Sequence, residues 1–257
     1  MHIEDAIFNG TETRPHDTGL QIPRSYGRCG LRYATGSTQG VLTVVDSSFT
    51  SFADGGMRLS GSDVVVTVQR SLFQDNQATG AQSDGAGIHA SGAHLIVSDS
   101  SFIRNDASSG EGGALFFSAS APATLSRVSF IDNSANTLGG AISCAETTEL
   151  LVEQSSFAQN SAGTAGSALN FLLGGASSSI FNCSFRNHSS SVPLVRADSP
   201  LQWVCQPGHW PPPTTGDLPQ SDFVGCPNHC DAGFYTVRSP TCRARPIALP
   251  APNAPPE

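Results

Sequence analysis

Apolar and polar positions recur along the chain in a fixed order, and phenylalanine marks that order best. Successive marked phenylalanines are 24 to 29 residues apart, after a longer first interval of 41 residues. A period of this length is typical of a solenoid in which each repeat forms one coil. The marked residues are Phe8, Phe49, Phe73, Phe102, Phe130, Phe157 and Phe185.

A strand is predicted before each of these phenylalanines. An aliphatic residue lies five positions before the phenylalanine, and a second apolar residue usually lies two positions before that. Apolar and polar residues alternate between them, as in a strand with one buried face. Three positions before the phenylalanine a polar residue breaks the alternation, which predicts a bend between two short strands. The first aliphatic set is Ile3, Val44, Val68, Val97, Leu125, Val152 and Ile180.

Asparagine follows the central phenylalanines at a distance of three residues. Asparagine tolerates left-handed backbone conformations, and stacked asparagines can form amide ladders. We therefore expect a structural role for these residues, and the pattern weakens at the ends, where Phe52 and His188 take the position. The asparagines are Asn76, Asn105, Asn133 and Asn160.

A run of small residues that ends in an aliphatic residue predicts a third strand, with tight turns and close approach of coils. Examples are Gly112-Gly113-Ala114-Leu115 and Gly139-Gly140-Ala141-Ile142. The sequence thus predicts an all-β fold, a single-stranded parallel β-helix of about seven coils over residues 1–202, five well formed and two degenerate. Residues 21–40 are expected to be an insertion loop.

Charged residues occupy the predicted bend in several coils and alternate in sign. One interpretation is an exposed ion ladder that opposes slippage of the coils, although exposed pairs of this kind contribute little stability. The other is a carboxylate and arginine site of the kind found in polyuronate lyases. We favour the ladder because the charges pair along the stack. Its members are Asp46, Arg70, Asp99 and Arg127.

Composition narrows the possible functions. Only 13% of residues are charged, the net charge is −8, and all 13 basic residues are arginine. A nucleic-acid-binding protein needs a basic surface, so we expect no nucleic acid partner. The first residues lack the basic and apolar parts of a signal peptide, and no apolar run is long enough to span a bilayer. Because the repeat already runs at Met1, we expect the chain to be part of a longer one.

Residues 203–245 form a cysteine-rich segment, and residues 246–257 a proline-rich tail that we expect to be disordered. Such a short segment cannot bury a sufficient core, so disulfides are the expected stabiliser, with three possible pairings. A zinc site that uses Cys226, His229 and Cys230 is the less favoured alternative. The disulfide candidates are Cys205, Cys226, Cys230 and Cys242.

The remaining cysteines and the glycosylation sequons add little chemistry. Cys144 and Cys183 fall on inward positions and are expected to be buried thiols, whereas Cys29 has no assigned role. We expect no cofactor and no metal. Sequons begin at Asn9, Asn182 and Asn187, which supports secretion only weakly.

The repeated Phe-x-x-Asn and Gly-Gly-Ala-Ile/Leu motifs over about residues 41–190 resemble those of the polymorphic outer membrane proteins of chlamydiae and related β-helix surface proteins. Phe102-Ile-Arg-Asn105 and Phe130-Ile-Asp-Asn133 match fully. The resemblance implies a right-handed, pectin-lyase-like β-helix and a role in adhesion; residues 1–257 depart from the chlamydial pattern in that we expect no membrane barrel among them. The segments Cys205-Gln-Pro-Gly-His-Trp210 and Cys230-Asp-Ala-Gly-Phe-Tyr235 resemble extracellular ephrin-receptor-like and growth-factor-receptor-like modules.

Two functions compete on this evidence. The favoured one is a non-enzymatic extracellular or cell-surface protein that acts in adhesion, as a scaffold, or by binding a surface glycan or protein. The alternative is a polysaccharide lyase or glycoside hydrolase, which would need two or three converging carboxylates. The residues after the glycine-rich runs, His89, Phe116 and Ser143, include no acid. An ice-binding solenoid would need a regular threonine ladder, whereas the exposed positions are mixed.

Overall fold

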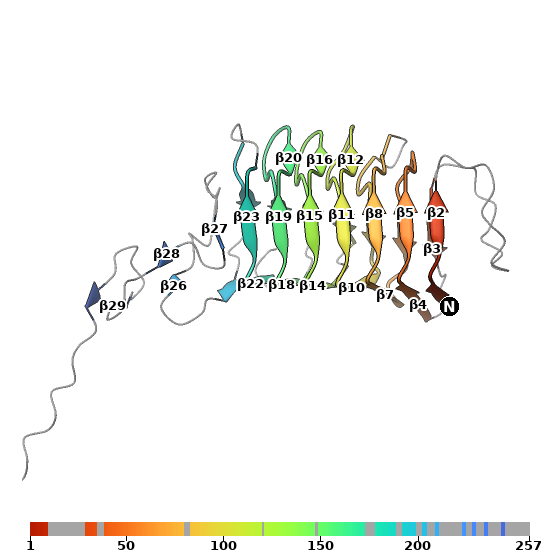
Figure 1. Cartoon of the computed structure of the whole chain (residues 1–257), viewed down its shortest axis with the longest axis horizontal. Coiled ribbons are helices and arrows are strands. Elements are labelled where there is room, and N and C mark those ends of the chain that lie inside the picture. Colours follow the sequence, from red (N-terminus) through yellow and green to blue (C-terminus); the bar gives the residue numbers. More distant parts are fainter. Residues whose placement is uncertain are drawn as a thin grey trace, which may run out of the picture.

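The computed structural model describes residues 1–9, 29–34, 39–79, 83–119, 121–146, 149–172, 178–188 and 192–198, and six short strands between residues 202 and 244. These parts contain strands and turns but no helix. The strands stack into a parallel β-solenoid of about six turns, a rod in which equivalent strands of successive coils lie side by side (Figure 1).

Three long sheets form the sides of the rod. The first sheet contains β1 (His2–Glu4), β4 (Gly40–Val45), β7 (Val64–Gln69), β10 (His94–Ser98), β14 (Ala123–Ser126), β18 (Leu150–Glu153), β22 (Ser179–Phe181) and β25 (Gln202–Val204). The second contains β2 (Ile7–Asn9), β5 (Ser48–Thr50), β8 (Leu72–Gln74), β11 (Ser101–Ile103), β15 (Ser129–Ile131), β19 (Ser156–Ala158), β23 (Ser184–Arg186) and β27 (Phe223–Val224). The third contains β3 (Leu31–Ala34), β6 (Met57–Ser60), β9 (Ile88–Ser91), β13 (Leu115–Ser118), β17 (Ile142–Cys144), β21 (Leu169–Phe171) and β24 (Val195–Ala197).

Smaller pairings complete the topology. A short parallel sheet extends the middle coils beyond the second sheet and contains β12 (Asp106–Ala107), β16 (Ser134–Ala135) and β20 (Ser161–Ala162). Near the C-terminus, β27 pairs with β23 in the antiparallel sense. Two more antiparallel pairs are β26 (His209–Trp210) with β28 (Asn228–His229) and β29 (Phe234–Tyr235) with β30 (Arg243–Ala244).

The core is a column of identical side chains. The rings of six phenylalanines, from Phe49 to Phe185, are fully buried and stacked, with centroids 4.8 to 5.2 Å apart. This spacing is the distance between neighbouring strands of a sheet, so the strand pairing itself imposes the ring stack. The predicted aliphatic set also lies inside, with each side chain at most 5% exposed.

The asparagines form a buried ladder, as predicted. All four are 0% exposed. The Nδ2 of Asn105 donates to the carbonyl of Phe73 in the preceding coil at 3.0 Å and to Oδ1 of Asn133 in the next coil at 2.9 Å. Oδ1 of Asn133 also accepts the backbone N–H of Asn105 at 3.0 Å. Each amide therefore replaces the hydrogen bonds that a buried turn would otherwise lose.

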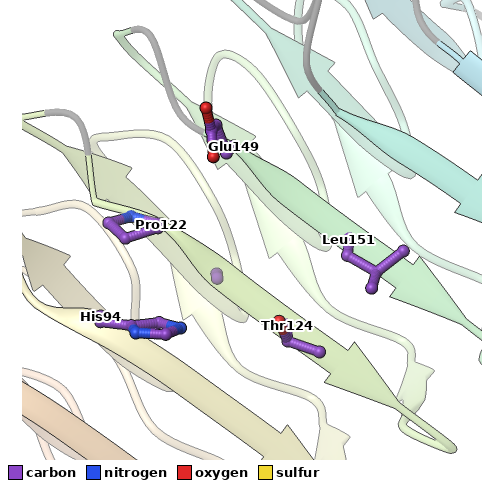
Figure 2. A pocket seen from close by; sticks show the side chains of 6 residues that line it. His94, Pro122, Thr124, Glu149 and Leu151 are labelled. Atoms are coloured by element: carbon purple, nitrogen blue, oxygen red, sulfur yellow. The ribbon is translucent and has the colours of Figure 1, made fainter.

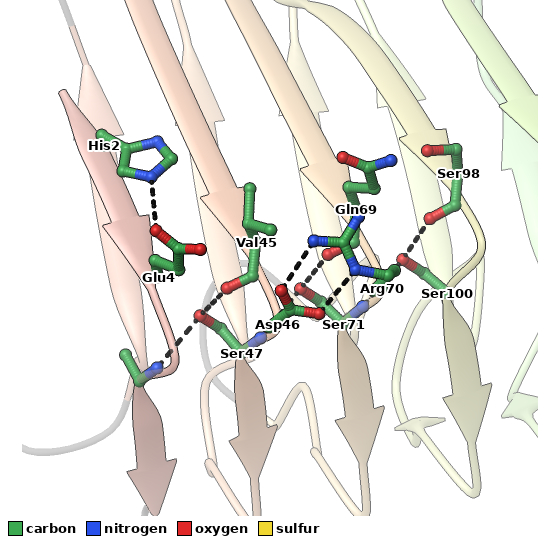
Figure 3. Close-up of polar contacts among 11 residues, drawn as sticks. His2, Glu4, Val45, Asp46, Ser47, Gln69, Arg70, Ser71, Ser98 and Ser100 are labelled. Carbon is green, nitrogen blue, oxygen red and sulfur yellow. Dashed lines mark hydrogen bonds and ion pairs between the residues drawn. The ribbon is translucent and has the colours of Figure 1, made fainter.

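A second ladder consists of serine hydroxyls two positions before the phenylalanines. Ser71 Oγ accepts the backbone N–H of Ser47 at 3.2 Å and donates to the carbonyl of Gln69 at 2.9 Å (Figure 3). Ser100 Oγ accepts the N–H of Ser71 in the same way at 3.0 Å. These hydroxyls satisfy backbone groups at the bend between the first and second sheets.

One detail of the local prediction was wrong. The small-residue runs are turns that precede the third strand, and that strand begins at the aliphatic residue, as at Leu115 of β13. Gly112 has a left-handed φ of +64°, and a Cβ on Gly113 would lie 2.3 Å from the carbonyl oxygen of Gly140. The ladder asparagines are not left-handed; the residue before each one is, including Asp75 at φ +55° and Arg104 at +51°.

The predicted insertion loop at 21–40 also needs correction. Residues Leu31–Ala34 form β3, which pairs in parallel with β6 and so belongs to the third sheet. Residues 10–28 and 35–38 lie outside the described part. The first coil is therefore described only in pieces, and the count of seven coils stays a prediction.

Replacement of a central ladder asparagine tests this account of the core. In Asn133→Ala, the carbonyl of Phe102 and the N–H of Asn105 lose partners at 3.0 Å in a buried environment. We expect a loss of about 2–4 kcal/mol in the free energy of unfolding, measured by denaturant titration. The matched control is Asn136→Ala, three residues away and exposed. Equal effects of the two substitutions would contradict the ladder's role.

Candidate functional site

The predicted polar ladder consists of two separate ion pairs. Arg70 Nε and Nη2 donate to the two carboxylate oxygens of Asp46 at 2.7 and 2.6 Å (Figure 3). Arg127 pairs with Asp99 in the same way at 2.6 and 2.8 Å. Within the described residues, no ion pair joins Arg70 to Asp99. All four residues have a left-handed φ between +46° and +54°, which confirms the predicted bend.

A third pair lies on the other edge of the second sheet. Arg104 Nε and Nη2 contact the two oxygens of Asp75 at 2.7 and 2.9 Å. The guanidinium beside each aspartate holds the pKa of Asp46, Asp75 and Asp99 below the usual value. Carboxylates held as ions by two-point contact with arginine are poor proton donors, so these pairs suit structure better than acid–base chemistry.

The outer face of the third sheet carries a different, non-repeating set of side chains. The second residue of each strand points outward and lies in register with the equivalent residue of the next strand, because the first and third residues face the core. This row is Arg32, Arg58, His89, Phe116, Ser143, Asn170 and Arg196. Ser143 and Asn170 are 0% exposed and Phe116 is 7% exposed, so part of the row is covered.

An acidic residue from a glycine turn joins this row. Ser143 Oγ donates to Glu111 Oε2 at 2.8 Å, and Asn170 Nδ2 donates to Ser143 Oγ at 3.0 Å. Burial raises the pKa of Glu111, and the charge of Asp84 adds to the shift, while the Ser143 hydrogen bond and Arg196 oppose it. Asp84 Oδ1 accepts the backbone N–H of Glu111 at 2.8 Å.

Asp84 and Glu111 therefore form an acidic pair on adjacent coils, one residue before Gly85 and Gly112. Sequence reasoning missed this pair because it did not look for carboxylates in the turns that precede the glycines. The two turns are stacked, since the N–H of Gly85 donates to the carbonyl of Glu111 at 2.9 Å. The sequence did contain a signal for this pair: Asp84 and Glu111 each come directly before the first glycine of a small-residue run, and equivalent turn positions stack.

A buried cation and a neutral histidine lie at the other end of the row. Arg58 is 5% exposed and donates to the carbonyls of Asp54 and Asp84, which ties two turns together. Burial, with the charge of Arg58, lowers the pKa of His89 to about 4, so this ring is neutral at pH 7. Phe116 packs edge-on against it, with ring centroids 5.0 Å apart.

Three buried polar atoms have no hydrogen-bond partner in the described structure: Asp54 Oδ1, His89 Nδ1 and Asn170 Oδ1. His89 and Asn170 belong to the outward row, and Asp54 precedes β6 of the same sheet. Unpaired buried polar atoms are uncommon and often mark a bound water, ion or ligand. The outer face of the third sheet is thus the better candidate for chemistry.

The first sheet carries a shallow hollow of about 280 Å³ on its outer side (Figure 2). His94 and Glu149 supply its polar rim, and Pro122 and Leu151 its apolar wall. The volume lies just below the usual range of small-molecule sites, so the hollow suits a surface contact better than an enclosed substrate. No group of three or more His, Cys, Asp or Glu side chains in the described residues is placed to hold a metal ion.

The cysteines in the core behave as predicted. Cys144 and Cys183 are free thiols, 1% and 0% exposed. Burial raises the pKa of Cys183 to about 12 and also raises the pKa of Cys144, so neither thiol is a nucleophile at neutral pH. Cys29 is half-buried, with its thiol 3.5 Å from the carbonyl of Leu31.

Several predicted residues cannot be placed. The four tail cysteines, Cys205, Cys226, Cys230 and Cys242, and the proline-rich tail lie outside the described residues, and so does the Asn9 side chain. Asn182 and Asn187 are exposed at left-handed bends of the last coils, with φ of +49° and +53°. Within the described residues, no helix is long and apolar enough to cross a membrane.

Comparison with known proteins agrees with this geometry. Searches of curated proteins and of solved structures return no match. The family model of the right-handed β-helix region matches residues 29–201, which is well over half of the chain. The chain therefore belongs to the right-handed β-helix family.

Proposed function

We propose that the protein is a non-enzymatic, extracellular or cell-surface rod that binds a surface glycan or protein or serves as a scaffold. One observation carries the proposal: three acids at the bends of the coils, Asp46, Asp75 and Asp99, each make two contacts with an arginine of the next coil. Because these carboxylates are already paired with arginines of the same chain, they are not free to bind a substrate. The pairs join successive coils and so favour a structural role for the repeat.

The outer face of the first sheet is the proposed binding surface. One of its rows combines hydroxyl and apolar side chains in register: Thr43, Thr67, Ile96, Thr124, Leu151 and Ser179. Leu151 is 36% exposed and Val41, on the neighbouring row, is 59% exposed. A flat surface of this composition suits a protein face or the apolar face of a sugar ring. The hollow beside Leu151 adds one histidine and one carboxylate for orientation.

The extracellular location and the adhesin-like role rest on sequence features. The four tail cysteines, the sequons and the resemblance to polymorphic outer membrane proteins favour an oxidising compartment. In this proposal residues 203–245 form a disulfide-stabilised module attached to a β-helix of about seven coils.

A carbohydrate-active enzyme is the second candidate, and Glu111 favours it. A half-buried carboxyl with a raised pKa is a suitable general acid, and Asp84 on the adjacent coil is a second carboxylate. Ser143 and Asn170 hold the Glu111 carboxyl in place by a chain of hydrogen bonds.

A glycan array combined with assays for reducing sugars and unsaturated products separates the two candidates. We expect array or protein binding without cleavage, and binding that persists in the double variant Asp99→Asn with Arg127→Gln, because that pair is structural. Cleavage that is lost in Glu111→Gln but kept in the double variant would establish the enzyme instead. Cleavage lost in the double variant would overturn the structural role of the ion pair.

Alkylation of the native protein tests the extracellular assignment. Without reductant, we expect little labelling of the four tail cysteines, because disulfides occupy them, and none of Cys144 and Cys183, because they are buried. Mass spectrometry of peptides reports each site. Ready labelling of all four tail cysteines that zinc suppresses would point to a metal site and contradict the disulfide module.

Glu111→Gln also has a predicted effect on stability. A carboxyl whose pKa is raised by folding stabilises the protein below its unfolded pKa, and this contribution is lost as pH rises through the folded pKa. The variant keeps an acceptor for Ser143 and removes the half-buried charge. We expect a gain of up to about 1 kcal/mol at pH 7, or ~2–4 °C in Tm, that disappears near pH 4. A pH-independent change in Tm would contradict the burial argument.

A further inference from the structure

The asparagine ladder ends at a histidine. In the inner coils the ladder amide donates to the phenylalanine carbonyl of the preceding coil, as Asn160 Nδ2 does to Phe130 at 3.0 Å. In the last coil His188 occupies the ladder position, and its Nε2 lies 3.1 Å from the carbonyl oxygen of Phe157. The ring thus replaces the amide at the equivalent bond.

The second ring nitrogen also faces a carbonyl. His188 Nδ1 lies 3.3 Å from the backbone oxygen of Asn160. In the inner coils, the equivalent oxygen accepts a backbone N–H; that of Asn133, for example, accepts the N–H of Ser161 at 2.9 Å. In the inner coils, an asparagine amide and a backbone N–H donate to these two carbonyl oxygens. In the last coil, the single ring of His188 contacts both of the equivalent oxygens, those of Phe157 and Asn160.

Carbonyl oxygens accept hydrogen bonds and cannot donate them. Both nitrogens of His188 must therefore carry hydrogen for the two contacts to be hydrogen bonds, and only the imidazolium does so; a neutral imidazole has one N–H. We propose that His188 is a pH-sensitive latch, which ties the last coil to the preceding one when protonated and releases one of the two bonds when neutral.

The described residues around the ring include one aromatic and one basic side chain. Phe185 of β23 packs at 6.3 Å between ring centroids, and the segment of the preceding coil from Phe157 to Asn160 contains no titratable side chain. On its own side of the coil, Arg186 is the nearest charged residue in sequence, and its side chain is exposed. Its positive charge opposes protonation, so the two acceptors must outweigh it.

The latch has a consequence beyond its own coil. β23 of this coil pairs with β27 through Phe185 and Phe223, so the C-terminal segment is attached where the latch acts. A group that is protonated preferentially in the folded state stabilises it below its unfolded pKa, and the effect is lost as pH rises through the folded pKa. Histidine titrates in solution near pH ~6.5, so we expect the last coil to loosen between about pH 6 and 8.

Hydrogen exchange of the full chain at pH 5.5 and 7.5, corrected for intrinsic rates, tests the latch. We expect protection of the β23 amides to fall roughly tenfold at the higher pH, the effect of losing one charge-assisted hydrogen bond. His188→Asn supplies a neutral donor like that of the inner coils and should make this protection independent of pH. His94→Asn, on the first sheet, is the matched control and should keep the wild-type pH dependence.

Nitrogen NMR of the histidine side chains measures the protonation of His188 directly in the wild-type protein. At pH 5.5 the His188 ring should show two slowly exchanging N–H groups, and it should deprotonate above the ordinary histidine pKa of about 6.5. A neutral His188 ring at pH 5.5, or a pH dependence of β23 protection that persists in His188→Asn, would overturn the latch.

Discussion

The fold depends on one constraint, the parallel pairing that places the same position of each coil beside its equivalent about 4.8 Å away. Each residue of a coil must therefore tolerate contact with the residues at the same position of the two neighbouring coils, which in the inward columns are often of the same type. Phenylalanine does so by stacking, as Phe73 and Phe102 show at 4.8 Å. Asparagine does so because an amide donates and accepts at once, so a polar column can be buried without unpaired groups. At the bends, Asp46 with Arg70 and Asp99 with Arg127 satisfy the same constraint because opposite charges lie side by side.

Much of the core could be predicted from the sequence, because residues that stack in one column of the structure recur at a regular spacing along the chain. The buried aliphatic residues, the phenylalanine column and the amide ladder followed from spacing and residue type alone, and so did the alternating charges. Backbone conformation did not follow in the same way. Both Asn76 and the residue before it, Asp75, are types that tolerate left-handed φ, and only the path of the chain decides that Asp75 adopts it. Similarly, Gly112 and Gly113 suit either a strand or a turn, and only the path of the chain gives Gly112 its left-handed φ and brings Gly113 against the carbonyl of Gly140.

The outer face of the third sheet was hard to predict for a different reason. Glu111 and Ser143 are 32 residues apart, more than one coil, and meet because a glycine turn folds over the neighbouring strand. Aligning equivalent positions of successive coils places Ser143 beside Phe116 and Asn170. Such an alignment does not show that the side chain of a turn residue reaches a strand residue at a different coil position. Arg58 is similar, since it reaches the turn of the next coil at Asp84. Contacts between different columns require the three-dimensional path of the turn.

Departures from the repeat therefore carry more information about function than the repeat does. Inward columns keep one residue type over many coils because stacking demands it, whereas the outward row changes from Arg58 to Phe116 to Asn170 within five strands. A partner that contacts this row meets a different side chain on each coil. It can therefore bind at one specific position along the rod, although the coils are otherwise nearly identical. His188 follows the same logic at the end of the ladder. It fits the geometry of the asparagine column but can gain and lose a proton, which no asparagine of the ladder can do, and it lies in the coil to which the C-terminal segment is paired.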